Sequence, residues 1–331
     1  MNTLAAADEH LSLFTSARPR LLSLAYRMTG SYSDSEDILQ DAYLKFARVP
    51  PEKIESAPAL LTTIVTRLSL DLLRSARKKR EAYVGPWLPE PMPDLYLAHE
   101  DAADRETVSM AFLLLLQKLP PVERAVFILR EIFDYDYAEI ARIVQKSADY
   151  CRQIFHRAKK NLRRQHRANP EPGEKERELL AAFLAACAGS NLENLVSLLQ
   201  KDAQLLSDGG GKASASSIPV IGARKFAKFV FAVRDKGGVR DYYIARINNG
   251  LAVVGYRGNE PYVVQIVEFA GNQVANNYAL RNPEKMRHFA DRRRLVREGV
   301  LIPTSRYFSL TQNLRLARSQ WGRFMAKIVG S

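Results

Sequence analysis

Residues 136–164, which read DYAEIARIVQKSADYCRQIFHRAKKNLRR, decide the fold of the block around them. Asp136 and Glu139 have the spacing of a capping box, in which two side chains close the start of a helix. After a short turn at residues 145–146, Ser147 is placed to cap a second helix. Two capped helices joined by a tight turn predict a helix-turn-helix unit.

The second of these helices is predicted to bury one face and to expose the other. Its apolar residues recur at helical spacing and should pack inward: Cys151, Phe155, Ala158 and Leu162. The opposite face carries donors and acceptors suited to base edges and phosphates: Asp149, Arg152, Gln153, His156, Arg157 and Lys160. The pattern alone is equally typical of a solvated face on a bundle helix, but the two caps and the tight turn favour DNA binding.

Proline-rich breaks divide the chain into blocks. Four prolines between residues 85 and 93 exclude a helix and predict a stiff, extended linker. A second break lies at residues 169–173. The blocks before and between the breaks show only helical periodicity. The third block begins with helical stretches and continues with alternating, β-branched segments at residues 242–247, 252–256, 262–269 and 274–280.

This pattern predicts a multidomain chain, with two all-α domains (a helical bundle and the helix-turn-helix) followed by an α+β domain. The limits expected from the sequence are a first helical domain at 1–84, a linker at 85–99, the helix-turn-helix domain at 100–168, the α+β domain at 174–291 and a basic C-terminal extension at 292–331. The extension is long and includes an amphipathic stretch around residues 314–328, and its role stays open.

A basic helix is predicted over residues 58–80. One stripe and its basic end present groups suited to a phosphate backbone: Thr63, Arg67, Arg74, Arg77, Lys78, Lys79 and Arg80. Arg67 can equally be interpreted as the partner of Asp71 in a surface ion pair. The cluster at 77–80 favours a nucleic-acid partner more strongly.

An acidic face is expected on the helix that follows Ser33, which has the spacing of a capping box with Glu36. This face suits a basic protein surface and contains Asp34, Asp37, Gln40 and Asp41. A catalytic interpretation is weak because no histidine, cysteine or glycine-rich phosphate loop accompanies these carboxylates.

The bulk composition is compatible with a nucleic-acid-binding protein. The formal net charge is +13 and the pI about 9.7, which favours polyanionic partners. Cys151 and Cys187 both lie in apolar helical patterns, so we expect reduced thiols in a cytoplasmic protein. No apolar run reaches the roughly 20 residues that span a bilayer. No cofactor is indicated, and no Cys/His cluster has metal-ligand spacing.

Several of these stretches together resemble the extracytoplasmic-function (ECF) sigma factors of bacterial RNA polymerase. LSLAYRMTG at 22–30 and DSEDILQDAYL at 34–44 look like the family's region for docking on the core enzyme. Residues 60–80 resemble its helix for the −10 promoter element, and residues 119–164 resemble its −35-reading domain. The second resemblance includes Ser147 and implies that it also contacts the −35 element. The resemblance implies that the partners are promoter DNA and the β′ and β subunits of core polymerase, and that Asp34, Asp37, Gln40 and Asp41 contact the polymerase.

Three further motifs resemble the subgroup that carries a fused SnoaL-like domain. These are YVGPWLPEP at 83–91, DGGGK at 208–212 and NPEKM at 282–286, the last with two mild substitutions. The resemblance implies a cone-shaped α+β domain that packs on the sigma domains and modulates promoter opening. The implied regulatory contacts are Trp87, Asp208, Gly209, Gly210, Gly211, Lys212, Asn282, Pro283, Glu284 and Lys285.

Two alternatives remain at this level. The first is a stand-alone helix-turn-helix regulator with a small-molecule-sensing domain, which would leave the block at 11–84 without a purpose. The second is an enzyme, because α+β domains host many chemistries. The carboxylates of the third block show no catalytic spacing, so enzyme activity is not expected. Whether the α+β domain binds a small molecule stays open.

Overall fold

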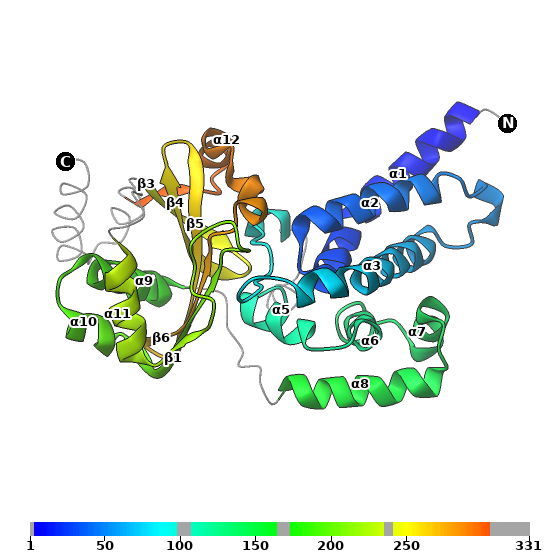
Figure 1. Ribbon diagram of the computed structural model, residues 1–331. Coiled ribbons are helices and arrows are strands. Elements are labelled where there is room, and N and C mark those ends of the chain that lie inside the picture. The colour runs from blue at the N-terminus through cyan, green and yellow to red at the C-terminus, as the bar shows by residue number, and fades with distance from the viewer. Residues whose placement is uncertain (1–2, 98–106, 164–172, 235–240, 305–331) are drawn as a thin grey trace. The chain divides into compact units, whose positions relative to one another are not determined.

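The chain forms two compact units (Figure 1). The computed structural model describes residues 3–97, 107–163, 173–234 and 241–304 of the 331 residues. The first unit comprises residues 1–82 and 96–168, and the second comprises residues 83–95 and 169–331. The proline-rich linker therefore belongs, for most of its length, to the second unit.

The first half of unit one is helical, as predicted. It contains α1 (Thr3–Thr29), α2 (Tyr32–Phe46), a 3₁₀ turn (Pro51–Lys53) and α3 (Ala57–Glu81). Apolar side chains from all three helices form its core, including the fully buried Tyr26, Phe46 and Leu61. A further 3₁₀ turn (Asp94–Leu97) marks the passage between the two units.

The cap of α2 differs from the prediction. Ser31, not Ser33, is the N-cap, and its side chain accepts a hydrogen bond from the Asp34 backbone N–H at 3.1 Å. The preceding Gly30 has φ +70 and follows the end of α1, and Ser31 has the extended backbone that an N-cap requires. Ser33 lies inside the first turn of α2, so the predicted capping box with Glu36 was wrong.

The second half of unit one contains the helix-turn-helix. Its helices are α5 (Met110–Gln117), α6 (Pro121–Glu131), α7 (Tyr137–Val144) and α8 (Ala148–Arg163). Both hydrogen bonds of the Asp136–Glu139 capping box are present, at 2.7 and 3.0 Å. Gln145 ends α7 with φ +56, and the Ser147 side chain accepts from the Tyr150 N–H at the start of α8. The predicted inward residues of α8 are all buried: Cys151, Phe155, Ala158 and Leu162.

Donors on one half of unit one satisfy acceptors on the other. The buried Arg124 on α6 donates to the carbonyl of Met28 at the end of α1. Arg20 on α1 donates to the carbonyl of Phe133 at 3.1 Å. The Tyr135 hydroxyl donates to Thr62 Oγ1 on α3 at 2.9 Å. Main-chain carbonyls near helix ends lack intrahelical partners, so the two arginines satisfy groups that would otherwise need water.

The second unit is an α+β domain built on one mixed sheet. Its elements are α9 (Glu174–Ala188), α10 (Leu192–Ser197), β1 (Leu199–Asp208), β2 (Val220–Ile221), α11 (Ala223–Val233), β3 (Asp241–Ile247), β4 (Gly250–Arg257), β5 (Glu260–Ala270), β6 (Gln273–Leu280), a 3₁₀ helix (Pro283–Phe289), α12 (Arg292–Arg297) and β7 (Ile302–Pro303). The strand order is β2-β1-β6-β5-β4-β3-β7, and only the β1–β6 pair is parallel.

Both faces of the central strands are covered. Leu251 and Val253 of β4 belong to the apolar core shared with α9, α10 and α11, which lie together on one side of the sheet (Figure 1). Ala252, Val254 and Tyr256 alternate with them and are also buried. On that second side the Tyr256 hydroxyl donates to the carbonyl of Phe289 at 2.8 Å. The 3₁₀ helix therefore packs on the face opposite to the three helices.

Four of the strands follow the predicted segments closely, but β1 was not predicted. Its sequence LQKDAQLLSD contains no β-branched or aromatic residue, and it pairs in parallel with β6, about 70 residues later in the chain. Residues 292–304, which the sequence analysis placed in a C-terminal extension, contain α12 and β7. Leu295 is 1% exposed, and β7 pairs with β3. The amphipathic stretch expected around residues 314–328 lies outside the described residues.

Candidate functional site

A network around the Asp208 carboxylate joins the proline-rich linker to the second unit. Asp208 ends β1 and is completely buried. Its Oδ1 accepts from the Tyr83 hydroxyl at 2.6 Å, and its Oδ2 accepts from the Leu88 N–H at 2.9 Å. Lys285 Nζ lies 2.7 Å from the same Oδ2. A buried carboxylate needs a counter-ion and hydrogen-bond donors, and here two of the donors come from Leu88 in the linker and from Tyr83 just before it.

Lys285 connects the three predicted motifs. Its ammonium also donates to the Leu88 carbonyl, and it lies 3.9 Å from the centre of the Trp87 ring. A cation over an indole face is attracted by the ring's quadrupole. The position of Trp87 is therefore stabilised electrostatically by Lys285. Trp87, Asp208 and Lys285, which the family resemblance implied as regulatory contacts, come together in the structure.

The Asn282 side chain orders the network from the other side. Its Oδ1 caps the 3₁₀ helix by accepting from the Glu284 N–H at 3.1 Å, and its Nδ2 donates to the Tyr83 oxygen at 2.9 Å. The pKa of the Tyr83 phenol is raised well above its ordinary value, mainly because the group is buried and secondly because it donates a hydrogen bond to Asp208. Tyr83 therefore stays protonated and donates to Asp208. Pro283 follows as the first residue of the 3₁₀ helix.

The three glycines allow the turn to pass close to this network. A Cβ on Gly210 would lie 2.3 Å from Asn282 Nδ2 and 2.8 Å from the Tyr83 hydroxyl, and its φ is +58. A Cβ on Gly209 would lie 2.1 Å from the Ala213 carbonyl oxygen. Gly211 has φ +71. Lys212 forms an ion pair with Glu284, and both side chains are half-exposed.

Further along, the linker contacts the second unit at every second residue. The buried Glu90 carboxylate lies 2.8 Å from His288 Nε2. The Met92 N–H donates to Asn248 Oδ1, and the Asn248 N–H donates to the Met92 carbonyl, both at 3.0 Å. Asp94 accepts from the Asn249 N–H at 2.9 Å. This period of two is that of an extended β-like chain, and the prolines exclude a helix in this segment.

Sequence reasoning missed several members of this site. Tyr83, Glu90, Asp94, Arg246 and His288 were not among the predicted contacts. Arg246 pairs with Asp94 at 3.2 Å. The available signal was the spacing of Leu88, Glu90, Met92 and Asp94, because an extended segment presents alternate residues to one side.

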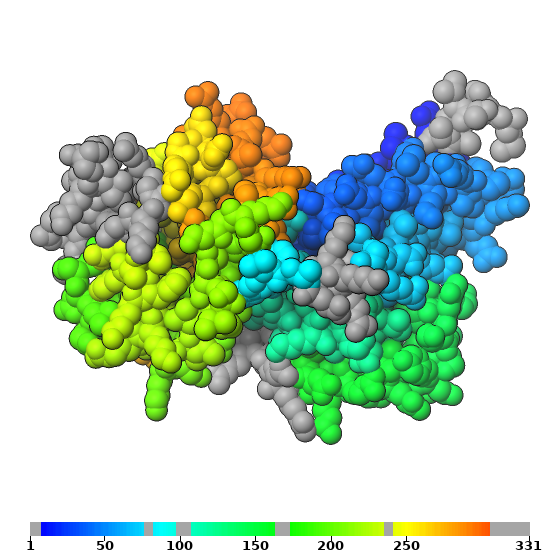
Figure 2. Space-filling model, viewed as in Figure 1, coloured from blue at the N-terminus to red at the C-terminus, as the bar shows by residue number. Residues whose placement is uncertain are grey.

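The predicted DNA-reading residues of α8 share one exposed face. Ser147, Asp149, Arg152, Gln153, His156, Arg157 and Lys160 are all exposed, and α8 lies at the surface of its unit (Figure 2). Arg152 pairs with Asp149 at 2.9 Å and Arg157 pairs with Glu123 of α6. Lys160 has no ion pair among the described residues. These contacts orient two guanidinium groups on the face that the sequence assigned to DNA.

The basic helix α3 presents a different arrangement. Arg67 Nε donates to the Ile143 carbonyl at 3.1 Å, and Arg67 Nη2 donates to the Arg142 carbonyl at 3.0 Å. Arg67 thereby satisfies two carbonyls in the last turn of α7. Asp71, the alternative partner considered for Arg67, pairs with Arg74 at 3.3 Å instead.

Other predicted contacts of α3 are only partly described. The Thr63 hydroxyl donates to the Ala59 carbonyl at 2.9 Å, so it is partly engaged within its own helix. The backbone of α3 continues through residues 77–80, but the structure does not describe the side chains of Arg77, Lys78, Lys79 and Arg80.

The acidic face of α2 is present. Asp37, Gln40 and Asp41 are exposed, and Asp34 is half-buried in the first turn. Among the described residues, neither Asp37 nor Asp41 forms an ion pair. Their charges are therefore available to a basic partner.

Neither a metal centre nor a membrane-spanning helix occurs in the described part of the chain. No cluster of three or more histidine, cysteine, aspartate or glutamate side chains there could hold a metal ion. None of the helices in the same ranges combines the length and apolarity needed to cross a bilayer. Both cysteines are free, and burial raises the pKa of each thiol.

Comparison with known proteins identifies the family. Residues 13–79 match the Sigma-70 region 2 model, and residues 109–162 match the Sigma-70, region 4 model. The ECF RNA polymerase sigma factor SigJ of Mycobacterium tuberculosis is 33% identical over 294 residues, which cover 83% of this chain and 92% of SigJ. SigG of the same organism is 29% identical over 218 residues, which cover 56% of this chain and 58% of SigG.

A solved structure extends this similarity to the fold. The crystal structure of M. tuberculosis SigJ aligns with a TM-score of 0.66 and 28% identity, covering 83% of this chain and 98% of SigJ. The chain belongs to the ECF sigma factor family of RNA polymerase. The predicted architecture of helical sigma domains followed by a SnoaL-like α+β domain is thereby confirmed.

We predict that Lys285→Met destabilises the second unit much more than Lys212→Met. Loss of Lys285 leaves a buried charge at Asp208 and should lower the free energy of unfolding by about 3–5 kcal/mol. Loss of the exposed Lys212–Glu284 pair should cost less than about 1 kcal/mol. Urea unfolding followed by Trp87 fluorescence, in a Trp321→Phe background, measures both. Equal midpoints for the two variants would contradict the network.

We predict that Gly210→Ala is more damaging than Gly258→Ala. Both glycines have positive φ, +58 and +61, so both substitutions add a similar backbone strain. Only the Gly210 Cβ meets other atoms, because nothing lies within 4 Å of the corresponding position at Gly258. Gly258→Ala should cost about 1 kcal/mol, and Gly210→Ala should exceed it by about 1–3 kcal/mol. The same unfolding assay applies, and identical losses would show that the close approach is unimportant.

Proposed function

We propose that α8 reads the −35 element, that α3 handles the opened −10 strand, and that the acidic face of α2 contacts the β′ subunit of core polymerase. As an ECF sigma factor, the chain is a transcription-initiation factor whose partners are RNA polymerase and promoter DNA. The observation that carries the residue assignment is the shared exposed face of α8, which begins at a capped helix start. Such a helix presents its N-terminal residues to base edges and its later basic residues to phosphates.

The role of Arg67 at the −10 element requires a rearrangement within unit one. Its guanidinium is engaged by carbonyls of α7, so it reaches a DNA strand only after α3 and α7 separate. Core polymerase would drive this separation by binding α2 more tightly in the form of unit one in which α3 and α7 are apart than in the closed form. The proposal thus predicts weak promoter binding by the chain alone.

The second unit regulates this separation through the linker. The linker connects the two helical halves of unit one along the chain. The Asp208 network holds residues 83–88 on the second unit, and Asn249 holds Asp94. A linker held in this way has less freedom to extend than a free one. The fused position keeps the effective concentration of the second unit high.

The chain acts without enzymatic chemistry and works in the cytoplasm, where RNA polymerase transcribes. Two buried carboxylates of the second unit have structural partners: Asp208 is in the linker network, and Glu268 accepts from Asn276 Nδ2 and the Tyr278 hydroxyl, both at 3.0 Å. These contacts support a binding domain.

Run-off transcription with purified core polymerase on genomic fragments tests the assignment. We expect start sites that appear only when the protein is added. Arg152→Ala with Lys160→Ala should reduce their yield by about tenfold or more, because base and phosphate contacts are lost. Arg177→Ala with Lys228→Ala, two exposed positions on α9 and α11, is the charge-matched control. Absence of new start sites together with tight duplex binding by the chain alone would indicate a stand-alone regulator.

The same assay tests the regulatory role. Lys285→Met should raise the run-off yield at least about fivefold relative to Lys212→Met, since a released linker lets the helical halves separate. A chain lacking residues 174–331 provides the second comparison. If neither variant changes promoter selectivity or yield, the second unit has no regulatory role.

A further inference from the structure

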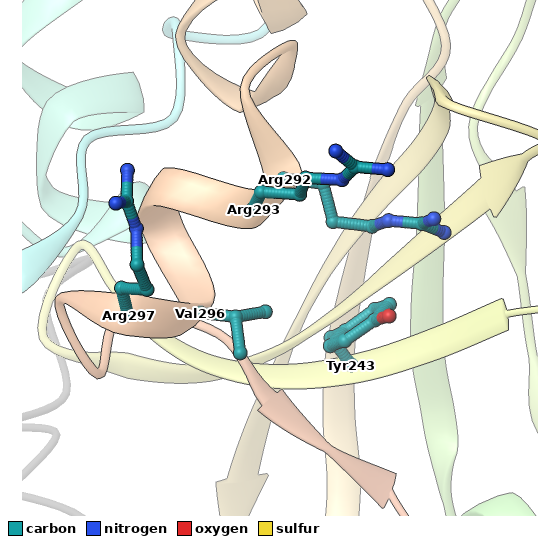
Figure 3. Close-up of a pocket in the computed structure, with 5 residues that line it drawn as sticks. All are labelled: Tyr243, Arg292, Arg293, Val296 and Arg297. Atoms are coloured by element: carbon teal, nitrogen blue, oxygen red, sulfur yellow. The ribbon is translucent and has the colours of Figure 1, made fainter.

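A hollow of about 650 Å³ lies between α12 and β3 (Figure 3). Its lining consists of Tyr243, Arg292, Arg293, Val296 and Arg297. The volume is within the range of small-molecule sites in proteins. The lining contains three arginines and no acidic residue. The hollow lies on the face of the sheet opposite to α9–α11, because Tyr243 alternates with Ile244 of the helix-covered core.

Arg292 is fixed in position by three acceptors. It donates to Asp241 Oδ2 at 2.8 Å, to the Gly258 carbonyl at 3.2 Å and to Asn259 Oδ1 at 3.2 Å. Its guanidinium carbon lies 5.4 Å from the centre of the Tyr256 ring. Asp241 offsets much of its charge, so Arg292 forms a preorganised wall of the hollow.

Arg293 and Arg297 are exposed, and among the described residues neither has an ion pair or a side-chain hydrogen bond. The nearby acidic residues have other partners: Asp291 accepts from the Arg294 N–H as the cap of α12, and Glu298 pairs with the Arg294 side chain at 3.0 Å. Two uncompensated positive charges therefore border the hollow. Guanidinium groups are suited to phosphate and carboxylate oxygens.

Apolar surface separates these charges. Val296 is 37% exposed although it is branched and apolar, and the half-buried Tyr243 ring lies across the hollow from α12 (Figure 3). Leu295 is buried on the other side of the same helix turn, so it anchors α12 to the domain. An occupant that uses the whole lining has a negatively charged end and an apolar body.

We propose that this hollow binds a small organic anion, whose phosphate or carboxylate pairs with Arg293 and Arg297 and whose apolar part packs on Val296 and Tyr243. The phosphate backbone of a DNA duplex would pair with the arginines but would leave Val296 and Tyr243 exposed to water. The chain's own residues 305–331 contain no aspartate or glutamate, so they do not complement the charge. The second unit is thereby a ligand-binding domain within a sigma factor.

Isothermal titration of the full-length chain with phenyl phosphate, inorganic phosphate and phenol tests the proposal. We expect phenyl phosphate to bind more tightly than inorganic phosphate, and phenol to show no binding up to about 10 mM. Arg293→Gln with Arg297→Gln should weaken phenyl phosphate binding by about tenfold or more, as expected for lost hydrogen bonds to a charged group. Arg177→Gln with Arg224→Gln, the same change in charge on α9 and α11, should leave it unaltered.

Two results would overturn the proposal. The first is no binding of phenyl phosphate to the wild-type chain at about 10 mM. The second is equal affinity of the wild-type chain and the Arg293→Gln, Arg297→Gln variant. If the first result is accompanied by a loss of promoter-DNA affinity in the variant, the arginines are assigned to a DNA contact.

Discussion

The negative charge of Asp208 constrains the second unit, because its carboxylate has no contact with water. Transfer of an unpaired carboxylate into the interior is too costly for a folded domain of ordinary stability, so every oxygen needs a donor. The donors come from three places in the chain: the Tyr83 hydroxyl, the Leu88 N–H and the Lys285 ammonium. Satisfying one charge therefore fixes the linker, the end of β1 and the 3₁₀ helix together. The glycine turn follows from the same requirement, since Gly210 leaves room for Asn282 and Tyr83.

Arginine has a comparable structural role in the first unit. Arg20, Arg67 and Arg124 each donate to main-chain carbonyls of another segment, near helix ends where such carbonyls lack partners. The excess of positive charge in this chain is thus divided between structural arginines and exposed ones. Net charge alone does not separate the two groups. Arg67 shows the difference: its position on α3 resembles a DNA contact, and its hydrogen bonds hold α7.

The same division gives the second unit its candidate ligand site. Arg292 is held by Asp241 and neighbouring oxygens, whereas Arg293 and Arg297 border the hollow without partners among the described residues. The fixed Arg292 gives the site a rigid wall before a ligand binds, and the two uncompensated arginines leave positive charge for an anion to neutralise. A sigma factor with such a domain has a physical means to couple a small anion to the state of its linker, because α12 and the 3₁₀ helix that carries Lys285 are consecutive in the chain.

The sequence by itself determined the elements whose causes are local. The capping box at Asp136, the inward spacing on α8 and the four alternating strands depend on residues within a few positions of each other, and all were predicted. The cap of α2 at Ser31 also has a local cause, because Gly30 with its positive φ directly precedes it. Local reasoning could not succeed at β1, which is a strand because β6 pairs with it. Only the tertiary structure brought Tyr83 to Asp208, 125 residues away, and Arg67 to Ile143, 76 residues away. Such pairs depend on which distant segments meet in the fold and on which acceptors remain unsatisfied there, and no local periodicity in the sequence records either.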